Sequence, residues 1–178
     1  MRKYLAVMLI AGIVSCTNTE KKVAGNSDTT TSDAATAAPA EVELKEPKVQ
    51  AIYNGYIILK DALVSTKFEE AKKAADALKA DLASYKGCEN TALIAEKIAT
   101  AADIAAQRKD FTSLSSDVIA LFKHADITKG AIFVQHCPMA NNGDGGDWLS
   151  SEQKIQNPYY GDEMMECGRV VETIKTAL

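Results

Sequence analysis

The chain has 178 residues and a formal net charge of −4, from 20 Lys and Arg against 24 Asp and Glu. At about 150 residues per domain, this length predicts one globular unit and a tail. The acidic balance, with no basic stripe, argues against a protein that holds nucleic acid by its phosphates. The 4 Cys are too few for a disulfide-dense scaffold.

The first fifteen residues have the pattern of an export signal. Arg2 and Lys3 precede an apolar run, residues 4–14, that is too short to span a bilayer. The run ends in Ile13-Val14-Ser15-Cys16, which resembles the bacterial lipobox, in which the cysteine is lipidated and becomes the mature N-terminus. Cys16 is therefore expected to anchor the protein in a membrane. An ordinary signal peptide followed by an unmodified cysteine is the alternative.

Thr17 follows the anchor instead of Asp. By resemblance to enterobacterial sorting, this favours the outer membrane. The protein is expected to face the periplasm, and exposure on the cell surface is the alternative. Residues 16–47 are rich in Thr, Ser and Ala without apolar periodicity, so they are expected to form a disordered linker. Residues 48–178 are left as the folded domain.

The first part of that domain is predicted to be helical. Apolar residues at helical spacing predict helices over about 49–64 and from a capping box at residues 66–69 to Gly87. The apolar face of residues 94–101 does not continue in the same helical register into residues 111–121, which predicts a break near Thr100. Thr100 with Asp103 would then cap a fourth helix that ends near His124. The expected fold is mainly α: an up-down four-helix bundle with an irregular C-terminal tail containing a short β-strand or hairpin.

The tail begins after Asp126, where Gly, Pro, Asn and Asp become frequent. A β-prone run over residues 131–135 predicts a short strand, and Pro138 would confine it to a sheet edge. Residues 141–147 are expected to form a solvated turn. A calcium site is disfavoured there because the twelve-residue spacing and the closing bidentate Glu are missing.

Several blocks of the sequence resemble a bacterial family of unknown function. The blocks are His136-Cys137-Pro138-Met139-Ala140, Trp148-Leu149-Ser150, Ile155-Gln156-Asn157-Pro158-Tyr159-Tyr160-Gly161 and Met164-Met165-Glu166-Cys167-Gly168, with Asp103-Ile104, Gln107-Arg108, Phe111 and Leu114-Ser115 upstream. The family occurs as small lipoproteins and as a C-terminal extension of periplasmic adaptor subunits of copper and silver efflux pumps. The resemblance implies a setting near metal efflux and no particular reaction.

The residues of the tail independently suggest a soft metal. Cys137 and Met139 are two apart and would share a face of an extended segment, whereas Met164 and Cys167 are three apart and would share a face of a helical turn. Thiolate and thioether sulfur suit Cu(I) or Ag(I), and the paired short spacings of a zinc site are absent. His136 is a second-rank ligand because it should point away from Cys137 along a strand.

A disulfide is the main alternative for the same cysteines. An exported protein meets an oxidising compartment, so a Cys137–Cys167 disulfide is favoured over free thiols, with Cys88 then left over, and another pairing of the three cysteines is a further alternative. Met139 and Met164 could equally be packing residues, and Met165 is out of phase with the others.

Other candidate residues are expected to be structural. His124 fits the C-terminal end of a helix, Arg108 an ion pair or a carbonyl cap, and Trp148, Tyr159 and Tyr160 packing over the helices. No Ser-His-Asp set, phosphate loop or zinc-hydrolase motif is apparent, so an enzyme is not expected.

These features lead to one expected function and one alternative. The expectation is a lipid-anchored cell-envelope protein that binds or transfers Cu(I) or Ag(I), as an accessory to metal efflux or homeostasis, with an efflux adaptor or pump as partner. The alternative is a disulfide-stapled protein-interaction module without a metal role. No nucleic acid or small-molecule substrate is expected in either case.

Overall fold

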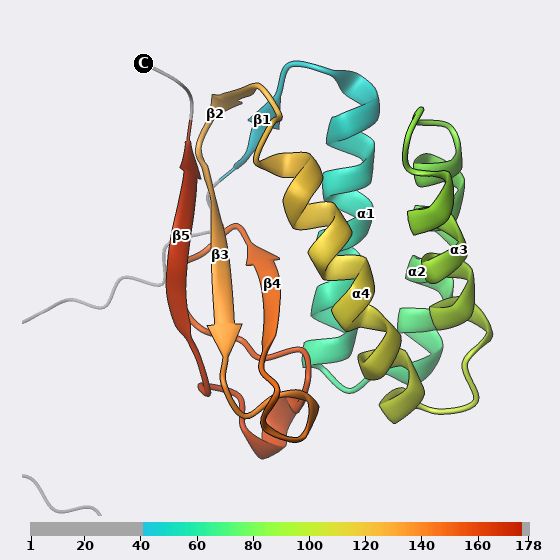
Figure 1. Ribbon diagram of the computed structural model, residues 1–178, viewed down its shortest axis with the longest axis vertical. Coiled ribbons are helices and arrows are strands. Elements are labelled where there is room, and N and C mark those ends of the chain that lie inside the picture. The colour runs from blue at the N-terminus through green and yellow to red at the C-terminus, as the bar shows by residue number, and fades with distance from the viewer. Residues whose placement is uncertain (1–40, 176–178) are drawn as a thin grey trace, which may run out of the picture. The chain divides into compact units, whose positions relative to one another are not determined.

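The computed structural model describes residues 41–175, which contain four α-helices and two small antiparallel sheets (Figure 1). The helices are α1 (Pro47–Val64), α2 (Phe68–Ala83), α3 (Glu89–Thr100) and α4 (Ile104–Phe122). The strands are β1 (Glu43–Leu44), β2 (Ile127–Lys129), β3 (Ala131–Cys137), β4 (Gly146–Ser150) and β5 (Arg169–Lys175). Figure 1 shows α1 and α4 between the β3-containing sheet and the α2–α3 pair.

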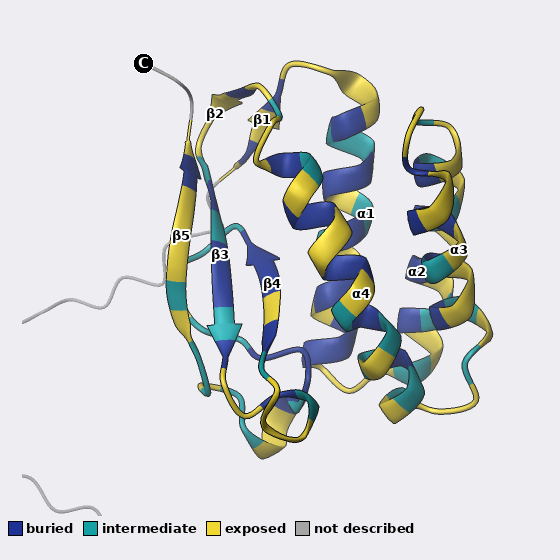
Figure 2. Cartoon of the chain, viewed as in Figure 1, coloured by how far each residue is buried: buried dark blue, intermediate teal, exposed yellow. Residues whose placement is uncertain are grey.

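The helical core follows the predicted periodicity. The apolar residues expected on the buried face of α1 are all fully buried: Ile52, Tyr56, Leu59 and Leu63. Four of those expected on α2 are fully buried as well: Ala71, Ala75, Leu78 and Leu82. Figure 2 shows buried residues along α1 and α4, the helices next to the sheet. The prediction of four helices is therefore confirmed, and their up-down arrangement stays a prediction.

Two predicted helix caps are wrong in detail. Lys67 occupies the N-cap of α2 without a side-chain cap, and Thr66 adopts a positive φ of 55° and accepts a hydrogen bond from Arg108 instead. At α4 the N-cap is Asp103, which is extended and whose carboxylate accepts from the Ala106 N–H at 2.8 Å. Thr100 ends α3 and donates back to the Glu96 carbonyl.

The C-terminal region is more regular than predicted. β3 is the central strand of an antiparallel sheet of order β4-β3-β5, so the expectation that Pro138 confines it to an edge is wrong. Pro138 does not interfere because β3 ends one residue before it, where no ladder hydrogen bond requires its missing N–H. Residues 141–143 form a single 3-10 turn, and Gly146 and Asp147 already belong to β4.

Hydrogen bonds and aromatic contacts join the sheet to the helices. The hydroxyl of Tyr56 on α1 accepts from the Leu149 N–H at the free edge of β4 and shares a 2.7 Å hydrogen bond with Ser115 on α4. Phe111 stacks on Tyr56 and also contacts Tyr159. The edge of β4 is therefore held by buried polar and aromatic groups of α1 and α4.

Folded structure begins before Lys48. β1 pairs with β2, and Val42 and Leu44 are buried, although residues 16–47 were predicted as linker. Residues 42–44 carry no helical periodicity, and their pairing partners lie more than eighty positions further along the chain. The local sequence therefore could not predict this pairing. Within residues 41–175, no helix combines the length and the apolar character needed to cross a membrane. Cys16 and the export signal lie outside the described residues.

Candidate metal-thiolate site

Two free thiols meet at the end of the sheet. Cys137 is the last residue of β3 and is fully buried, and Cys167 lies in the turn before β5 and is partly exposed. The Cys137 thiol lies close enough to Cys167 to raise the pKa of Cys167. Two cysteines 30 residues apart in the sequence are thus neighbouring free thiols in the fold.

The strand register explains why the two cysteines meet. β3 and β5 pair antiparallel, and the pairing ends at His136 opposite Arg169. The next residues of each segment, Cys137 and Gly168, are therefore neighbours. Gly168 lets the backbones approach closely, because a Cβ there would lie 2.9 Å from the His136 carbonyl oxygen and from Trp148. A larger residue at Gly168 would push Cys167 away from Cys137.

A buried asparagine fixes the turn that carries Cys167. Asn157 is fully buried, its side-chain amide donates to the Cys167 carbonyl, and its N–H donates to the Met165 carbonyl. Its side-chain oxygen accepts from the Tyr159 N–H at 2.8 Å. These bonds hold the segment that leads into Cys167 against the segment that follows β4.

Both predicted methionine ligands contribute backbone groups at this site. The Met139 backbone lowers the pKa of Cys167, and the Met139 carbonyl accepts from the Tyr160 hydroxyl at 2.6 Å. The Met164 carbonyl accepts from the Cys167 N–H at 3.1 Å. The Met139 side chain is 54% exposed, so it reaches the solvent beside the thiols. Met165, expected to pack, is partly exposed.

The local contacts oppose thiolate formation at Cys167. The neighbouring Cys137 thiol and burial raise the pKa of Cys167, and the Met139 backbone offsets part of this shift. Both thiols must lose their protons before the two sulfurs can bind one cation. A soft cation that replaces these protons would form two metal–thiolate bonds.

His136 is separated from the thiols. Its Nδ1 lies 2.7 Å from the Asp147 Oδ1 on β4, on the opposite face of β3 from Cys137, as the alternation along a strand predicts. Within residues 41–175, no three His, Cys, Asp or Glu side chains are placed to hold one metal ion. The five predicted ligands therefore fall into three groups. Cys137 and Cys167 form the thiol pair, Met139 and Met164 contribute backbone groups next to it, and the imidazole of His136 lies apart.

The remaining predicted residues take structural places. Arg108 donates to the Pro158 and Leu63 carbonyls, which makes it a carbonyl cap that ties the tail to α1. Trp148 and Tyr159 are buried against each other. Cys88, a free and buried thiol, precedes α3, and its burial raises its pKa.

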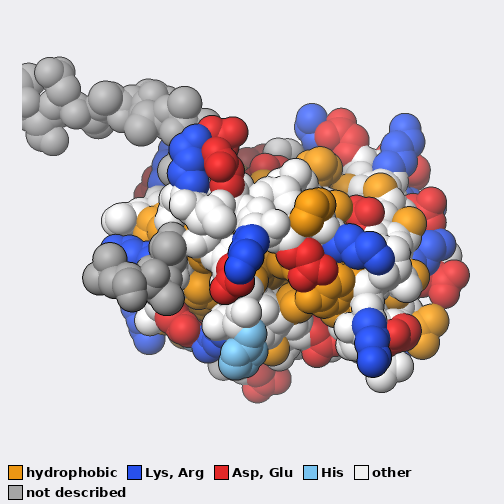
Figure 3. Space-filling model, turned by 90° about the horizontal axis from the view of Figure 1, so that it is seen from above, with side chains coloured by type: hydrophobic (Ala, Val, Ile, Leu, Met, Phe, Trp, Pro, Cys, Tyr) orange, Lys and Arg blue, Asp and Glu red, His pale blue; other side chains and the backbone are white. Residues whose placement is uncertain are grey.

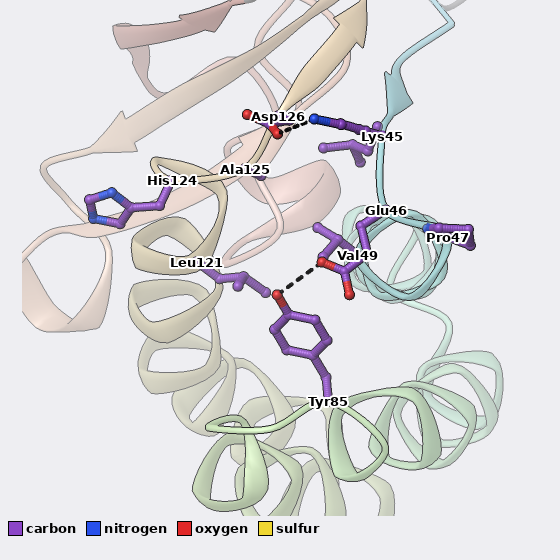
Figure 4. Close-up of a pocket in the computed structure, with 10 residues that line it drawn as sticks. Lys45, Glu46, Pro47, Val49, Tyr85, Leu121, His124, Ala125 and Asp126 are labelled. Atoms are coloured by element: carbon purple, nitrogen blue, oxygen red, sulfur yellow. Dashed lines mark hydrogen bonds and ion pairs between the residues drawn. The ribbon is translucent and has the colours of Figure 1, made fainter.

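A separate cavity of about 430 Å³ lies at the opposite end of β3, between the start of α1 and the end of α4 (Figure 4). The Tyr85 hydroxyl donates to Glu46 at its mouth, and His124, just past α4 as predicted, turns away from this contact. Figure 3 looks onto this end and shows basic and acidic side chains intermixed. The cavity therefore has no strong charge of one sign.

Sequence reasoning missed Asn157, Tyr160 and Asp147, which position the cysteines and His136. Asn157 and Tyr160 stand in a segment that carries the family resemblance, but a motif does not say which backbone groups a side chain will bind. Asp147 was assigned to a solvated turn. Its role depends on its register against His136, which local sequence does not specify.

The helical part of the chain is similar to a family whose function is unknown. Residues 52–130 match the family model described as a protein of unknown function (DUF3347). This range runs from α1 to the end of β2, so β3, β4 and β5 with the thiol pair lie beyond it. The predicted resemblance to a family of unknown function is confirmed for this segment, and the lipoprotein and efflux settings stay predictions. Comparison with curated proteins and with solved structures gave no match.

Proposed function

We propose that this protein is a lipid-anchored cell-envelope protein that binds and hands over Cu(I) or Ag(I), as an accessory to metal efflux or homeostasis. The observation that carries the proposal is that strand register brings the free thiols of Cys137 and Cys167 close together, near enough for Cys137 to raise the pKa of Cys167. Monovalent copper and silver accept soft thiolate ligands, and two facing sulfurs provide a low-coordinate site for one ion. The ion is the cargo of the protein.

Binding replaces two S–H protons by one cation. Each cysteine loses its proton to solvent, and both sulfurs bind the ion, so capture of one Cu(I) releases two protons. Cys137 is rigidly held by its position in β3, and Cys167 is reached from solvent. An incoming ligand of a partner protein would therefore displace Cys167 first. The exposed thioether of Met139 stands at the rim as a third soft ligand during this exchange.

The membrane setting of the proposal rests on the sequence. A lipidated Cys16 would tether the domain through residues 17–40 to the outer membrane, facing the periplasm, where an efflux adaptor or pump is the proposed recipient of the ion. Replacing Cys16 by Ser is expected to move the protein from the membrane fraction to the soluble fraction. Membrane association that persists in this variant would contradict the anchor.

A disulfide-stapled interaction module is the second candidate, and the same proximity favours it. Neighbouring thiols need little movement to form a disulfide, and the exported location would supply an oxidant. In that case the C-terminal region is a scaffold that docks on an envelope partner. Neither candidate includes a catalytic reaction.

Thiol protection separates the two candidates. We would alkylate the reduced full chain under anaerobic conditions with and without one equivalent of Cu(I), and identify the modified cysteines by mass spectrometry. The metal proposal predicts that Cu(I) protects Cys137 and Cys167 and leaves the labelling of Cys88 unchanged. Equal labelling of Cys167 with and without Cu(I) would contradict it. A Cys137–Cys167 disulfide in the untreated protein, together with no copper uptake by the reduced protein, would favour the module.

A further inference from the structure

The thiol pair does not use His136, which faces a second polar site on the other side of β3. His136 and Asp147 are cross-strand neighbours on β3 and β4, and their side chains are joined by a 2.7 Å hydrogen bond. Cys137 is paired with Gly146 at the next position and points to the opposite face. The imidazole of His136 and the thiol of Cys137 therefore lie on opposite faces of the sheet.

The hydrogen bond to Asp147 determines which ring nitrogen of His136 is available. A carboxylate can only accept, so the Nδ1 of His136 carries the hydrogen and Nε2 of the neutral ring keeps its lone pair. A histidine oriented by a carboxylate in this way is the usual arrangement of an imidazole that binds a metal through its other nitrogen. The pair thus presents an oriented nitrogen donor.

A glycine holds the ring in place. Gly145 has a φ of +83°, and a Cβ on it would lie 2.8 Å from Cε1 and 3.4 Å from Nε2 of His136. The backbone of Gly145 therefore packs directly against the edge of the ring. The loop is in turn fixed to α4, because Asn141 accepts from the Thr112 hydroxyl and donates to the Gly145 carbonyl. The imidazole ring, with its donor nitrogen Nε2, is therefore held by Asp147 at Nδ1 and by the backbone of Gly145 at the ring edge.

The space beside the ring is small, polar and acidic. A cavity of about 210 Å³ is lined by Thr112, Ser116, His136, Asp144, Gly145, Gly146 and Asp147. The lining holds two carboxylates, two hydroxyls and one imidazole, and no Lys or Arg contributes to it. Such a lining favours a cation over an anion, and its nitrogen and oxygen donors suit a divalent ion of intermediate softness more than Cu(I).

We propose that this cavity is a second cation site, separate from the thiol pair, that takes a divalent ion of the Cu²⁺ or Zn²⁺ class. Nε2 of His136 is the nitrogen ligand, and Asp144, the Ser116 hydroxyl and water supply oxygens. Asp147 is a positioning residue that orients the ring. Because the protein supplies few ligands, the site binds weakly and exchanges its ion readily.

The test uses Cu²⁺ as probe on the full chain with Cys137 and Cys167 both replaced by Ser, so that neither thiol binds or reduces the ion. Electron paramagnetic resonance is expected to show one bound Cu²⁺ with coupling to a single imidazole nitrogen. Replacing His136 by Ala should abolish that signal. His136→Phe, which keeps a ring and lacks the nitrogens, should do the same if the alanine variant is unstable.

The other histidine supplies the matched control. His124→Ala should leave the imidazole-coupled signal unchanged, and Asp147→Asn should weaken binding by about tenfold or more while keeping the nitrogen coupling. An unchanged signal in a folded His136 variant, or its loss in His124→Ala, would overturn the second site. Cys137 and Cys167 are replaced in every sample, so this outcome is independent of whether the proposed Cu(I) function holds.

Discussion

At the scale of single residues, a few buried polar side chains connect the sheet to the helices. Tyr56 is fully buried, and its hydroxyl bonds to both Ser115 and the backbone of Leu149. Burial raises its pKa well above the usual range of a tyrosine, so the hydroxyl stays protonated at any ordinary pH. The tyrosine therefore acts as a neutral partner for two groups that water cannot reach.

Replacing Tyr56 by Phe is expected to destabilise the protein by about 1–3 kcal/mol, because the Leu149 N–H and the Ser115 hydroxyl lose a buried partner. Urea denaturation followed by circular dichroism measures the change. Tyr85→Phe is the control, since its hydroxyl makes one 3.3 Å contact to Glu46 near the surface. Equal losses in the two variants would contradict the assigned role of Tyr56.

The three cysteines of the folded part are expected to differ in reactivity. Cys88 is buried, and burial with the nearby charges of Glu89 and Asp117 raises its pKa, so little thiolate forms near pH 8. Cys167 is partly exposed and should be alkylated first despite its own raised pKa. Iodoacetamide labelling followed by peptide mapping checks the order. Cys88 reacting before Cys167 in the folded protein would contradict it.

At the scale of elements, glycine and arginine join the tail to the helices. Gly161 begins a short 3-10 turn with a φ of +58°, and a Cβ there would lie 2.5 Å from the Thr66 hydroxyl and 2.8 Å from Arg108. The same arginine caps carbonyls at the end of α1 and at Pro158. The segment leading to Cys167 therefore approaches α1 closely at one point.

Replacing Gly161 by Ala is expected to cost about 2–5 kcal/mol, since the strain of a left-handed backbone adds to overpacking against fixed neighbours. Gly87→Ala is the matched control. It has a φ of +94° and nothing within 4 Å of the added Cβ, so it should cost about 1–2 kcal/mol. Chemical denaturation compares them, and a Gly87 variant as unstable as the Gly161 variant would contradict the close approach.

The elements also show how far the sequence can be interpreted alone. The apolar faces of α1 and α2 were predicted because helical burial repeats every three to four residues within one segment. The pairings of β1 with β2 and of β3 with β5 join segments that are distant in the sequence. The local pattern therefore predicted β3 and none of its partner strands. At the site, Cys137 and Cys167 were predicted together, whereas the separation of His136 with Asp147 followed from strand register.

At the scale of the whole molecule, the thiol pair links the end of β3 to the final strand. Mild oxidation is expected to join Cys137 and Cys167 and to stabilise the folded state by about 3–4 kcal/mol, because closing this loop restricts the unfolded chain. Denaturation of the oxidised and reduced protein measures the difference. A disulfide that instead joins Cys88 to Cys137 or to Cys167 would contradict the close placement of Cys137 and Cys167.

The central claim is that Cys137 and Cys167 hold one soft monovalent ion. The most direct measurement is an anaerobic titration of the reduced full chain with Cu(I) in competition with a chromogenic chelator. The account predicts that one equivalent is withheld from the chelator, that Cys137→Ser and Cys167→Ser each abolish this, and that Cys88→Ser does not. If the reduced chain withholds no copper, or a folded Cys137→Ser variant withholds as much as the parent, the claim is wrong.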